Sequence, residues 1–595
     1  MEKLTDFVAR RLQDLGIVHV FMVTGGGAMH LNDSLSHRSG LNVIYCHHEQ
    51  ACAIAAEGAY RATGRVACVN VTTGPGGLNT LTGVLGQWTD SIPAIYISGQ
   101  VKFETTIGSC PALGLRQLGD QEVDIVSIVK PIVKYAVQVN DPSKIRYELE
   151  KAFAIAMSGR MGPVWLDIPM NVQGALVDET TLPGYIKASE AAIDVGSPAL
   201  PDVIDALASA KRPLVVLGHG IRLAGAIKEM EEFLSLIAAP VVTTFNGFDL
   251  VPERHSLFVG RIGTLGSRSG NFALQNADLV LELGSRNNIR QSSYDWANFA
   301  HRAKRIIVDI DEAELRKPTV SPTIPVHMDV RRFLTEANRA IRVRADARMD
   351  HSEWLSWCKE RMAKYPVVLD SYSDDSSGIN PYFFFKEITR TIGPEAISVA
   401  GNGTACVCLF QAGIVNPGTR FFWNSGCASM GYDLPAALGA AAASRHSVFC
   451  FAGDGSLQMN IQELQTIVTN KLSVKILYLN NGGYISIKQT QDSFFHRRAG
   501  CDANSGIEMP SMERLAGAYG IPYIPVRFCH ECAEVSGHLL SFDGPGIAEV
   551  FLSKEYAFMP KTASERLPDG RMVSKPLEDL FPFLDRGEFE KNMIR

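Results

Sequence analysis

The 595-residue chain lacks several features that would set it apart from globular enzymes. It has no uninterrupted apolar run of the about 18 residues that a membrane-spanning helix needs. It has no excess of positive charge, since 57 Lys and Arg stand against 63 Asp and Glu, and no basic patch or tail is visible. Its opening residues, Met1–Asp6, lack the basic and then apolar segments of a secretory signal. These absences argue against a membrane protein and against a partner such as nucleic acid or anionic lipid, and we expect a cytoplasmic protein.

The 12 cysteines fit a cytoplasmic protein. Cys52, Cys68 and Cys450 stand singly in apolar stretches, where a thiol packs as a small apolar group. Cys529–Cys532 has zinc-knuckle spacing, but no second Cys/His pair lies at a distance that would complete four ligands. Cys46–Glu49 is rich in possible ligands, yet consecutive strand residues point to opposite faces. We therefore expect no metal at either segment.

What the sequence does contain is a repeated alternation of apolar strand runs with amphipathic helices. At about 150 residues per domain the length suggests three or four domains. A polar linker is expected at 183–201 and a charged, Ser- and Asp-rich separator at 344–378. The predicted fold class is α/β, with three doubly wound parallel-sheet domains that bind ligands at the carboxyl ends of their strands. The predicted divisions are 1–185, 195–343 and 378–557, with an irregular tail at 558–595 that drapes over another surface.

The strongest motif joins two neighbouring strands of the third domain. Gly453-Asp454-Gly455 ends a buried strand and precedes a helix, whose free N–H groups suit a phosphate. Asn481 follows the next strand and reaches the same sheet edge. A carboxylate and an amide at that edge suit a magnesium ion bridging a diphosphate. A lone Gly-Asp-Gly would be only a capped turn, but strand, helix, strand and Asn in this order favour the cofactor site.

This pairing resembles the thiamine diphosphate motif of the thiamine-dependent decarboxylase and synthase superfamily. The resemblance implies that the Asp454 carboxylate, the Asn481 side chain and the Gly483 carbonyl hold Mg²⁺. It also implies that Met430 wedges between the two rings of the cofactor and bends it into its reactive shape. The remaining positions implied to contact thiamine diphosphate are Gly26, Thr73, Asn79, Gly403, Thr404, Ala428, Gly453, Gly455, Ser456, Tyr484 and Ile485.

Glu49, at the start of a predicted helix, is the second signal. Alone it would be a first-turn Glu favoured by the helix dipole. The stretch from His48 to Gly64 resembles the superfamily pattern His-Glu-x-x-Ala-x-x-x-Ala-x-Gly-Tyr-Ala-Arg-x-Thr-Gly, which implies a catalytic role. Thiamine chemistry needs a carboxylate against N1′ of the aminopyrimidine, where a shared proton promotes the imino tautomer. We expect a buried Glu49 carboxyl with a raised pKa.

Other segments resemble acetohydroxyacid (acetolactate) synthases and spread over nearly the whole chain. One of them implies that Gln121 lies in the active site. The segments are Val71–Asn79, Ile97–Gln100, Asp120–Asp124, Gly162–Pro169 and Gly426–Ala437.

The middle domain resembles the flavin domain of those synthases, which implies FAD in a structural rather than a redox role. Gly218-His219-Gly220 alone is a weak dinucleotide signal. A vestigial nucleotide fold that binds nothing is the alternative. The residues implied to contact FAD are Gly218, Gly220, Thr244, Gly263, Gly266, Arg286, Arg290, Asp309 and Asp329.

The chain also departs from acetolactate synthases near the expected thiazolium. His30 stands where the family has aliphatic residues, Asp120 replaces a Phe, and Thr404 and Ser486 lie in altered segments. The segments around Thr404 and Arg286 look like those of FAD-containing, acetyl-transferring carboligases of branched-chain deoxysugar (yersiniose-type) pathways. This likeness implies that pyruvate, a 2-oxoacid donor, is decarboxylated and its acetyl unit passed to a ketone acceptor such as a nucleotide-linked keto-sugar. His30 would then handle a proton or bind the acceptor.

Several alternatives stay open. They are an acetolactate synthase large subunit, a cyclic-diketone hydrolase, a pyruvate-oxidase-type flavoenzyme and a catalytically retired relative. Retention of Glu49, Asp454 and Asn481 together speaks against the last. In the superfamily the first domain of one chain faces the third domain of its partner. The resemblance therefore implies a homodimer or homotetramer with active sites at the dimer interface.

Overall fold

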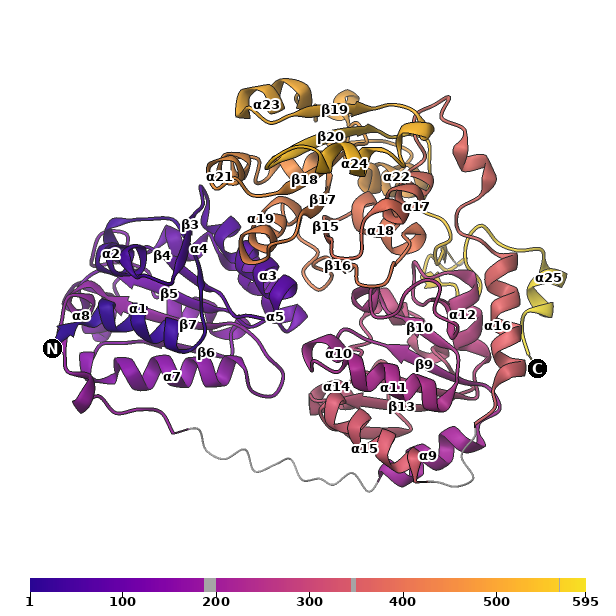
Figure 1. Ribbon diagram of the computed structural model, residues 1–595, viewed down its shortest axis with the longest axis horizontal. Coiled ribbons are helices and arrows are strands. Elements are labelled where there is room, and N and C mark those ends of the chain that lie inside the picture. The colour runs from indigo at the N-terminus through magenta and orange to yellow at the C-terminus, as the bar shows by residue number, and fades with distance from the viewer. Residues whose placement is uncertain (187–198, 344–348, 567, 595) are drawn as a thin grey trace.

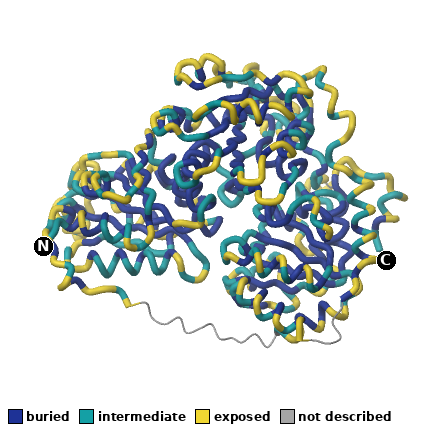
Figure 2. Tube along the Cα trace, in the orientation of Figure 1, coloured by how far each residue is buried: buried dark blue, intermediate teal, exposed yellow. Residues whose placement is uncertain are grey.

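The computed structural model describes residues 1–186, 199–343, 349–566 and 568–594, and Figure 1 shows them as three α/β domains. Each domain is built on one six-stranded sheet, and the strands within each sheet are parallel. Because these strands are covered by helices on both faces, they carry almost continuous apolar side chains. Figure 2 shows their buried tubes inside each domain. The predicted fold class is confirmed.

In the first domain the strand order reverses between β2 (His19–Met22) and β4 (Cys68–Val71). Ligands bind at such a reversal point in open α/β sheets. A short pair, β1 (Glu2–Lys3) and β8 (Leu176–Val177), closes its edge. The sheet order is β3 (Asn42–Tyr45), β2 (His19–Met22), β4 (Cys68–Val71), β5 (Ile95–Gln100), β7 (Val164–Pro169) and β6 (Tyr135–Gln138). Its helices are α1 (Leu4–Asp14), α2 (Met29–His37), α3 (Glu49–Thr63), α4 (Pro75–Leu78), α5 (Leu81–Asp90), α6 (Ile125–Val129), α7 (Ile145–Ala156) and α8 (Met170–Gln173).

The second domain has the strand order of a dinucleotide-binding fold, with the reversal between β9 and β12. Its sheet order is β11 (Phe258–Arg261), β10 (Val241–Thr243), β9 (Pro213–Leu217), β12 (Leu279–Leu283), β13 (Lys304–Asp309) and β14 (Ile324–His327). Its helices are α9 (Ala199–Ser209), α10 (Gly220–Leu223), α11 (Ile227–Ile237), α12 (Arg268–Asn276), α13 (Ile289–Ser292), α14 (Glu312–Arg316), α15 (Val330–Arg342) and α16 (Ser352–Lys364).

The third domain repeats the order of the first, with its reversal between β15 and β17. Its sheet order is β16 (Arg420–Phe422), β15 (Ile397–Ala400), β17 (Val448–Gly453), β18 (Val474–Asn480), β20 (Gly546–Phe551) and β19 (Tyr523–Val526). Its helices are α17 (Pro381–Thr391), α18 (Thr404–Ala412), α19 (Asp433–Ala443), α20 (Asp454–Gln458), α21 (Glu463–Thr469), α22 (Ile485–Phe494), α23 (Met512–Tyr519) and α24 (Val535–Leu540).

Helices α3 and α19 join the first and third domains through very close backbone packing. A Cβ on Gly58 would lie 2.1 Å from the carbonyl oxygen of Ala436, and one on Gly439 would lie 1.9 Å from that of Ala55. No side chain fits at either glycine, so the two helices approach along their backbones. Their small residues form one core that continues from the first sheet to the third. This packing fixes where the two domains present their sheet edges to each other.

Two segments depart from the prediction, and a third lies partly outside the described residues. The separator at 344–378 contains α16, which packs its buried Trp354 and Cys358 against the second domain. The tail is less irregular than expected, because it contains β21 (Ser564–Arg566), β22 (Met572–Ser574) and α25 (Arg586–Lys591). It does drape over the second domain, where α12 side chains bond the carbonyl oxygens of residues 577, 580 and 592. Residues 187–198 of the expected linker are not among the described ones.

No helix within the described ranges is both long enough and apolar enough to cross a membrane.

Candidate active site

The carboxyl ends of β17 and β18 bring Asp454 against the loop that contains Asn481 and Gly483. Oδ2 of Asp454 accepts the N–H groups of Asn481 at 3.0 Å and Gly483 at 2.9 Å, while Oδ1 accepts that of Gly455 at 2.9 Å. Gly483 has a φ of 125°, and a Cβ there would lie 2.2 Å from the Cys501 carbonyl oxygen, so only glycine fits. The residues of the strongest motif therefore converge on one place.

This cluster is buried and rich in oxygen. Asp454 is 2% exposed, and burial raises the pKa of its carboxyl to about 6 against the opposing effect of the backbone N–H groups. Oδ1 of Asn481 accepts the Tyr556 hydroxyl at 3.1 Å and the Thr404 hydroxyl at 3.4 Å. A carboxylate, an amide oxygen and a loop carbonyl form a donor set that suits a hard cation. Elsewhere in the described ranges, no three His, Cys, Asp or Glu side chains are placed to share a metal.

The other expected residues of the third domain surround this cluster. Gly403, with a φ of 70°, and Thr404 follow β15 at the reversal point of the sheet. The Tyr484 ring lies across Gly455, where a Cβ would come within 1.8 Å of it. Ser456 accepts the Gly431 N–H at 2.8 Å, which ties the loop containing Ala428 and Met430 to α20. Gly453 caps α20 and Ile485 begins α22 as a buried residue.

Tyr556, which no sequence motif predicted, also belongs to this cluster. Its hydroxyl bonds both Thr404 and Asn481. Tyr556 follows β20, far along the chain from either motif, and no local pattern marks it. It becomes visible only when the third sheet is assembled.

Glu49 lies at the N-terminus of α3, on the first domain. Its Oε2 accepts the Asn79 side chain at 3.0 Å, and the loop at Gly76 packs beside it. The expectation that Glu49 is buried is wrong for the single chain, because Glu49 is half-buried and Asn79 is exposed. Leu78 and Asn79 beside it are exposed as well, so this face of the first domain is open to solvent. Within the described residues Asn79 is the hydrogen-bond partner of Glu49, and no bond joins it to the Asp454 cluster.

The rest of the first-domain residues lie along the same sheet edge. Thr73 is buried and donates to the Gly99 carbonyl at 3.1 Å, whereas Gly26 is exposed. Gln121 is exposed with a φ of 62°, and its backbone packs so tightly on Gly74 that a Cβ there would lie 2.0 Å from the Gln121 carbonyl oxygen. Gln121 therefore stands beside the loop that follows β4.

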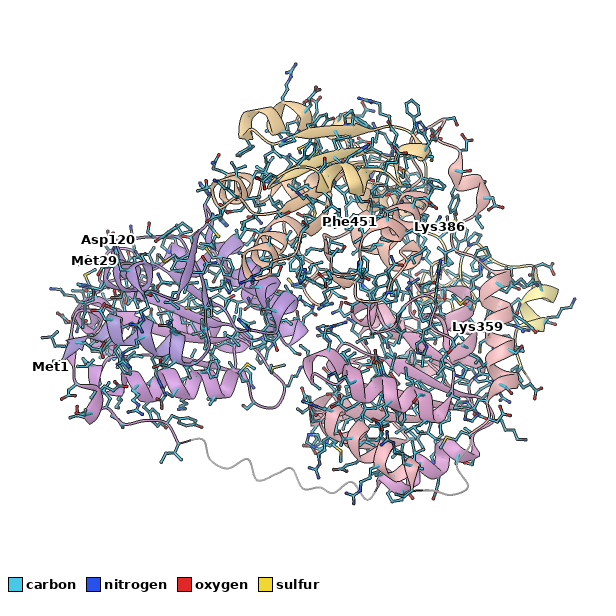
Figure 3. All side chains as sticks on the ribbon, viewed as in Figure 1. Met1, Met29, Asp120, Lys359, Lys386 and Phe451 are labelled. Carbon is cyan, nitrogen blue, oxygen red and sulfur yellow. The ribbon has the colours of Figure 1, made fainter. Side chains whose placement is uncertain are left out.

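The four polar residues expected near the thiazolium belong to two different domains of the chain. His30, on α2, is half-buried near Gly174 of the first domain, and Asp120 is exposed on that domain (Figure 3). Thr404 and Ser486 belong to the third domain. The Thr404 hydroxyl bonds the side chains of Asn481 and Tyr556.

A cavity opens at the reversal point of the second sheet, between the ends of β9 and β12. Five of the residues implied for FAD line it, namely Gly220, Thr244, Arg286, Asp309 and Asp329. The other four do not line it, namely Gly218, Gly263, Gly266 and Arg290.

Three of those four residues pack closely against other parts of the second domain. A Cβ on Gly218 would lie 2.2 Å from the Gly284 carbonyl oxygen, and one on Gly263 would lie 2.8 Å from that of Arg290. The Arg290 guanidinium lies over the Phe245 ring, 4.7 Å from its centroid. These residues therefore shape the walls behind the cavity.

The cavity contains charges of both signs. Arg286 reaches across to the first domain and donates to the Thr89 carbonyl at 2.9 Å. Burial raises the pKa of the Asp309 carboxyl to about 6, and Asp329 caps the N-terminus of α15. Arg160, which the sequence analysis missed, also lines the cavity and pairs with acidic residues of α14. An acidic residue at the end of β13 and an arginine after β12 are groups that suit the ribose and diphosphate of a nucleotide.

The comparisons with known proteins agree with this arrangement. Residues 2–128 match the model of the N-terminal binding domain of thiamine pyrophosphate enzymes, residues 200–337 that of the central domain, and residues 401–550 that of the C-terminal binding domain. The chain belongs to the thiamine pyrophosphate-dependent enzyme family.

Several similar proteins within that family are acetolactate synthases. The chain is 30% identical to the acetolactate synthase large subunit of Lactococcus lactis, over 93% of each chain. It is 32% identical to the large subunit of Corynebacterium glutamicum, over 88% of this chain and 82% of that one. It is 33% identical to the isozyme 1 large subunit of Escherichia coli, over 83% and 84%.

Proposed function

We propose that this enzyme is a thiamine diphosphate- and Mg²⁺-dependent carboligase of the acetolactate synthase type. It would decarboxylate pyruvate and join the remaining two-carbon unit to a second 2-oxoacid. The observation that carries the proposal is the convergence of Asp454, Asn481 and Gly483 at one sheet edge. The family match and the acetolactate synthase relatives support the reaction class.

The residues at the third sheet fit the cofactor. Mg²⁺ would bind the Asp454 carboxylate, the Asn481 amide oxygen and the Gly483 carbonyl, and it would hold the diphosphate against α20. A divalent cation would keep the Asp454 carboxyl ionised in spite of its burial. When bound, thiamine diphosphate supplies the stabilised carbanion that decarboxylation and ligation require. Met430, at the loop tied to α20, would press on the cofactor from the third domain.

Glu49 would exchange a proton with the aminopyrimidine. Its carboxylate, held by Asn79, stands on an open face. A second copy of the chain would cover this face with its third domain, which would complete two equivalent sites. Exposed Leu78, Leu113 and Leu118 on the first domain, and exposed Phe494 and Phe495 at the end of α22, provide apolar surface for such contacts. We therefore include a homodimer, or a tetramer of two such dimers, in the proposal.

The second-domain cavity would bind FAD in a structural role. Gly220, Arg286 and Asp309 have the chemistry for a dinucleotide, at the place in the sheet where such ligands bind. Gly263, Gly266 and Arg290 would support this ligand from behind the wall.

A ketone acceptor is the second candidate, and the polar side chains of His30 and Asp120 favour it. A site built to hydrogen-bond a polar acceptor discriminates against one that cannot make those bonds. In a dimer these two residues would face the third domain of the partner chain.

One competition experiment separates the two candidates. The enzyme receives [2-¹³C]pyruvate together with 2-oxobutyrate or a panel of ketones, including a keto-sugar nucleotide, and the products are identified by NMR. The proposal expects labelled acetolactate or acetohydroxybutyrate as the main product. Two results together would establish the second candidate instead. A ketone adduct would form faster than these products, and His30→Ala would lower the rate of adduct formation more than the rate of pyruvate consumption.

A further inference from the structure

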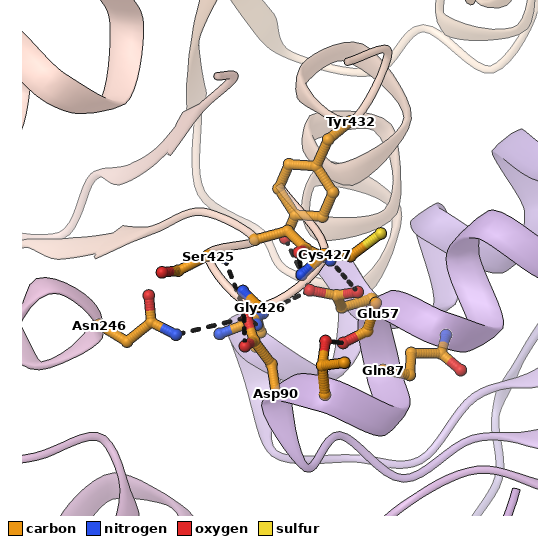
Figure 4. A network of polar contacts seen from close by, with 12 residues as sticks. Glu57, Gln87, Asp90, Asn246, Ser425, Gly426, Cys427 and Tyr432 are labelled. Carbon is orange, nitrogen blue, oxygen red and sulfur yellow. Dashed lines mark hydrogen bonds and ion pairs between the residues drawn. The ribbon is translucent and has the colours of Figure 1, made fainter. Parts of the chain in front are cut away.

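One buried carboxylate, that of Asp90 at the end of α5, joins all three domains (Figure 4). The Asp90 side chain is 1% exposed and pairs with Arg61 of α3 at 2.7 Å. It accepts the backbone N–H groups of Ser425 at 3.2 Å and Gly426 at 3.0 Å, which belong to the third domain. Asn246 of the second domain donates to it at 3.3 Å. The carboxylate therefore has four donors from three separate parts of the chain.

The two N–H groups belong to the loop 424–431, which leads directly to the proposed cofactor site. The loop is fixed at its far end, where Ser456 accepts the Gly431 N–H at 2.8 Å, and in its middle, where Asn402 donates to the Ser429 carbonyl at 2.8 Å. Ala428 adopts a φ of 55°, so the loop has a sharply defined shape. Asp90 is the anchor at its near end.

Gly426 shows how closely the anchor fits. A Cβ at this position would lie 2.4 Å from the Thr89 hydroxyl oxygen and 2.6 Å from Oδ1 of Asp90. Only a residue without a side chain can approach the carboxylate so closely. Glu57 completes the support, because its carboxylate accepts the Tyr432 hydroxyl at 3.0 Å and pairs with Arg61 at 2.8 Å.

We propose that Asp90 is a positioning residue that sets the loop 424–431, and through it Met430, in the conformation that binds thiamine diphosphate. The first domain would then act on two sites: Glu49 on the site completed by the partner chain, and Asp90 on the loop of its own chain. This inference rests on the proposed function for the ligand, but the effect of Asp90 on the loop can be measured without any ligand.

The test compares Asp90→Asn with Asp249→Asn. Asp249 is a matched control because it is another buried carboxylate at the domain junction. It pairs with Arg420 at 2.6 Å and accepts a backbone N–H of the third domain, that of Phe421, at 3.0 Å. Its bonds do not reach the loop 424–431. Both variants lose one buried charge beside an arginine, so both should lose thermal stability.

The first measurement is hydrogen–deuterium exchange of the full-length chain without ligands. Asp90→Asn should speed exchange at Ser425 and Gly426 about tenfold or more, because hydrogen bonds to a charged acceptor are lost. The second is titration with thiamine diphosphate in excess Mg²⁺, where Asp90→Asn should weaken binding about tenfold and leave the KM for pyruvate within about threefold. Asp249→Asn should change neither quantity.

Gly426→Ala provides the same test from the loop side, and it covers the case that Asp90→Asn does not fold. Its methyl group should displace the carboxylate and reproduce the faster exchange and the weaker binding. Wild-type loop exchange in Asp90→Asn, or equal changes in Asp90→Asn and Asp249→Asn, would overturn the inference. If wild-type protein binds no thiamine diphosphate, the proposed function fails, while the exchange data still decide the role of Asp90.

Discussion

The substitution Asp454→Asn tests the cation site with little change in volume. In the wild type, Oδ2 of Asp454 accepts two N–H groups and Oδ1 accepts one. The amide of Asn keeps one of these acceptor oxygens and turns the other into a donor. A buried donor left unsatisfied costs about 1–3 kcal/mol. The expected loss of unfolding free energy is therefore about 1–3 kcal/mol if Oδ1 is replaced and about 2–6 kcal/mol if Oδ2 is replaced.

The effect on cofactor binding should be larger and specific. Asn removes the one anionic side chain of the donor set, so we expect affinity for thiamine diphosphate in excess Mg²⁺ to fall at least about 100-fold. Isothermal titration calorimetry measures this affinity, and a thermal melt measures the stability loss beside it.

Glu549→Gln is the matched control for this experiment. Glu549 is a buried carboxylate on the adjacent strand β20, and it accepts the Asn480 side chain at 2.7 Å and the Tyr523 hydroxyl at 2.6 Å. The Glu549→Gln variant should lose stability and keep the wild-type cofactor affinity. Cofactor binding by Asp454→Asn within about threefold of wild type would refute the assignment of this carboxylate to the cation.

Glu49→Gln should fold and bind the cofactor normally but lower turnover about 10²–10⁴-fold, because Gln cannot share a proton; steady-state kinetics beside a cofactor titration check this. Mixing inactive Glu49→Gln chains with inactive Asp454→Ala chains should restore up to about one quarter of wild-type activity, since half of randomly formed dimers are mixed and each has one intact site. A fully active monomer in light scattering would contradict this shared site. Glu282→Gln should raise the melting temperature at pH 8 and have less effect at pH 5. Burial raises the pKa of the Glu282 carboxyl from 4.5 to about 7, so the wild type loses up to about 3 kcal/mol as pH rises through that range. Equal melting shifts at both pH values would contradict the buried, proton-linked carboxyl.

The sequence predicted those features that depend on short stretches of chain. Apolar strand runs alternating with helices are enough to predict parallel sheets, because such strands are buried on both faces. Asp454 and Asn481 follow adjacent strands, so their meeting at one edge required only the order of the elements. The helix α16 was missed because its charged residues hide the few apolar ones, Trp354 and Cys358, that it buries.

Contacts between domains could not be predicted in the same way. Tyr556 bonds Asn481 from the segment that follows β20, and Asp90 meets Ser425 and Asn246 only after three domains have packed. No local pattern marks such partners. Glu49 is half-buried rather than buried. Its exposure depends on the surface of the whole first domain and cannot be predicted from its helix alone.

Release of labelled CO₂ from [1-¹³C]pyruvate measures decarboxylation at this site directly. The account predicts that protein freed of cofactors releases CO₂ only when thiamine diphosphate and Mg²⁺ are both restored. It predicts that Glu49→Gln and Asp454→Asn both lose most of this activity, the first with normal cofactor binding and the second without it. Release of CO₂ at the wild-type rate by either variant, or in the absence of thiamine diphosphate, would contradict the account.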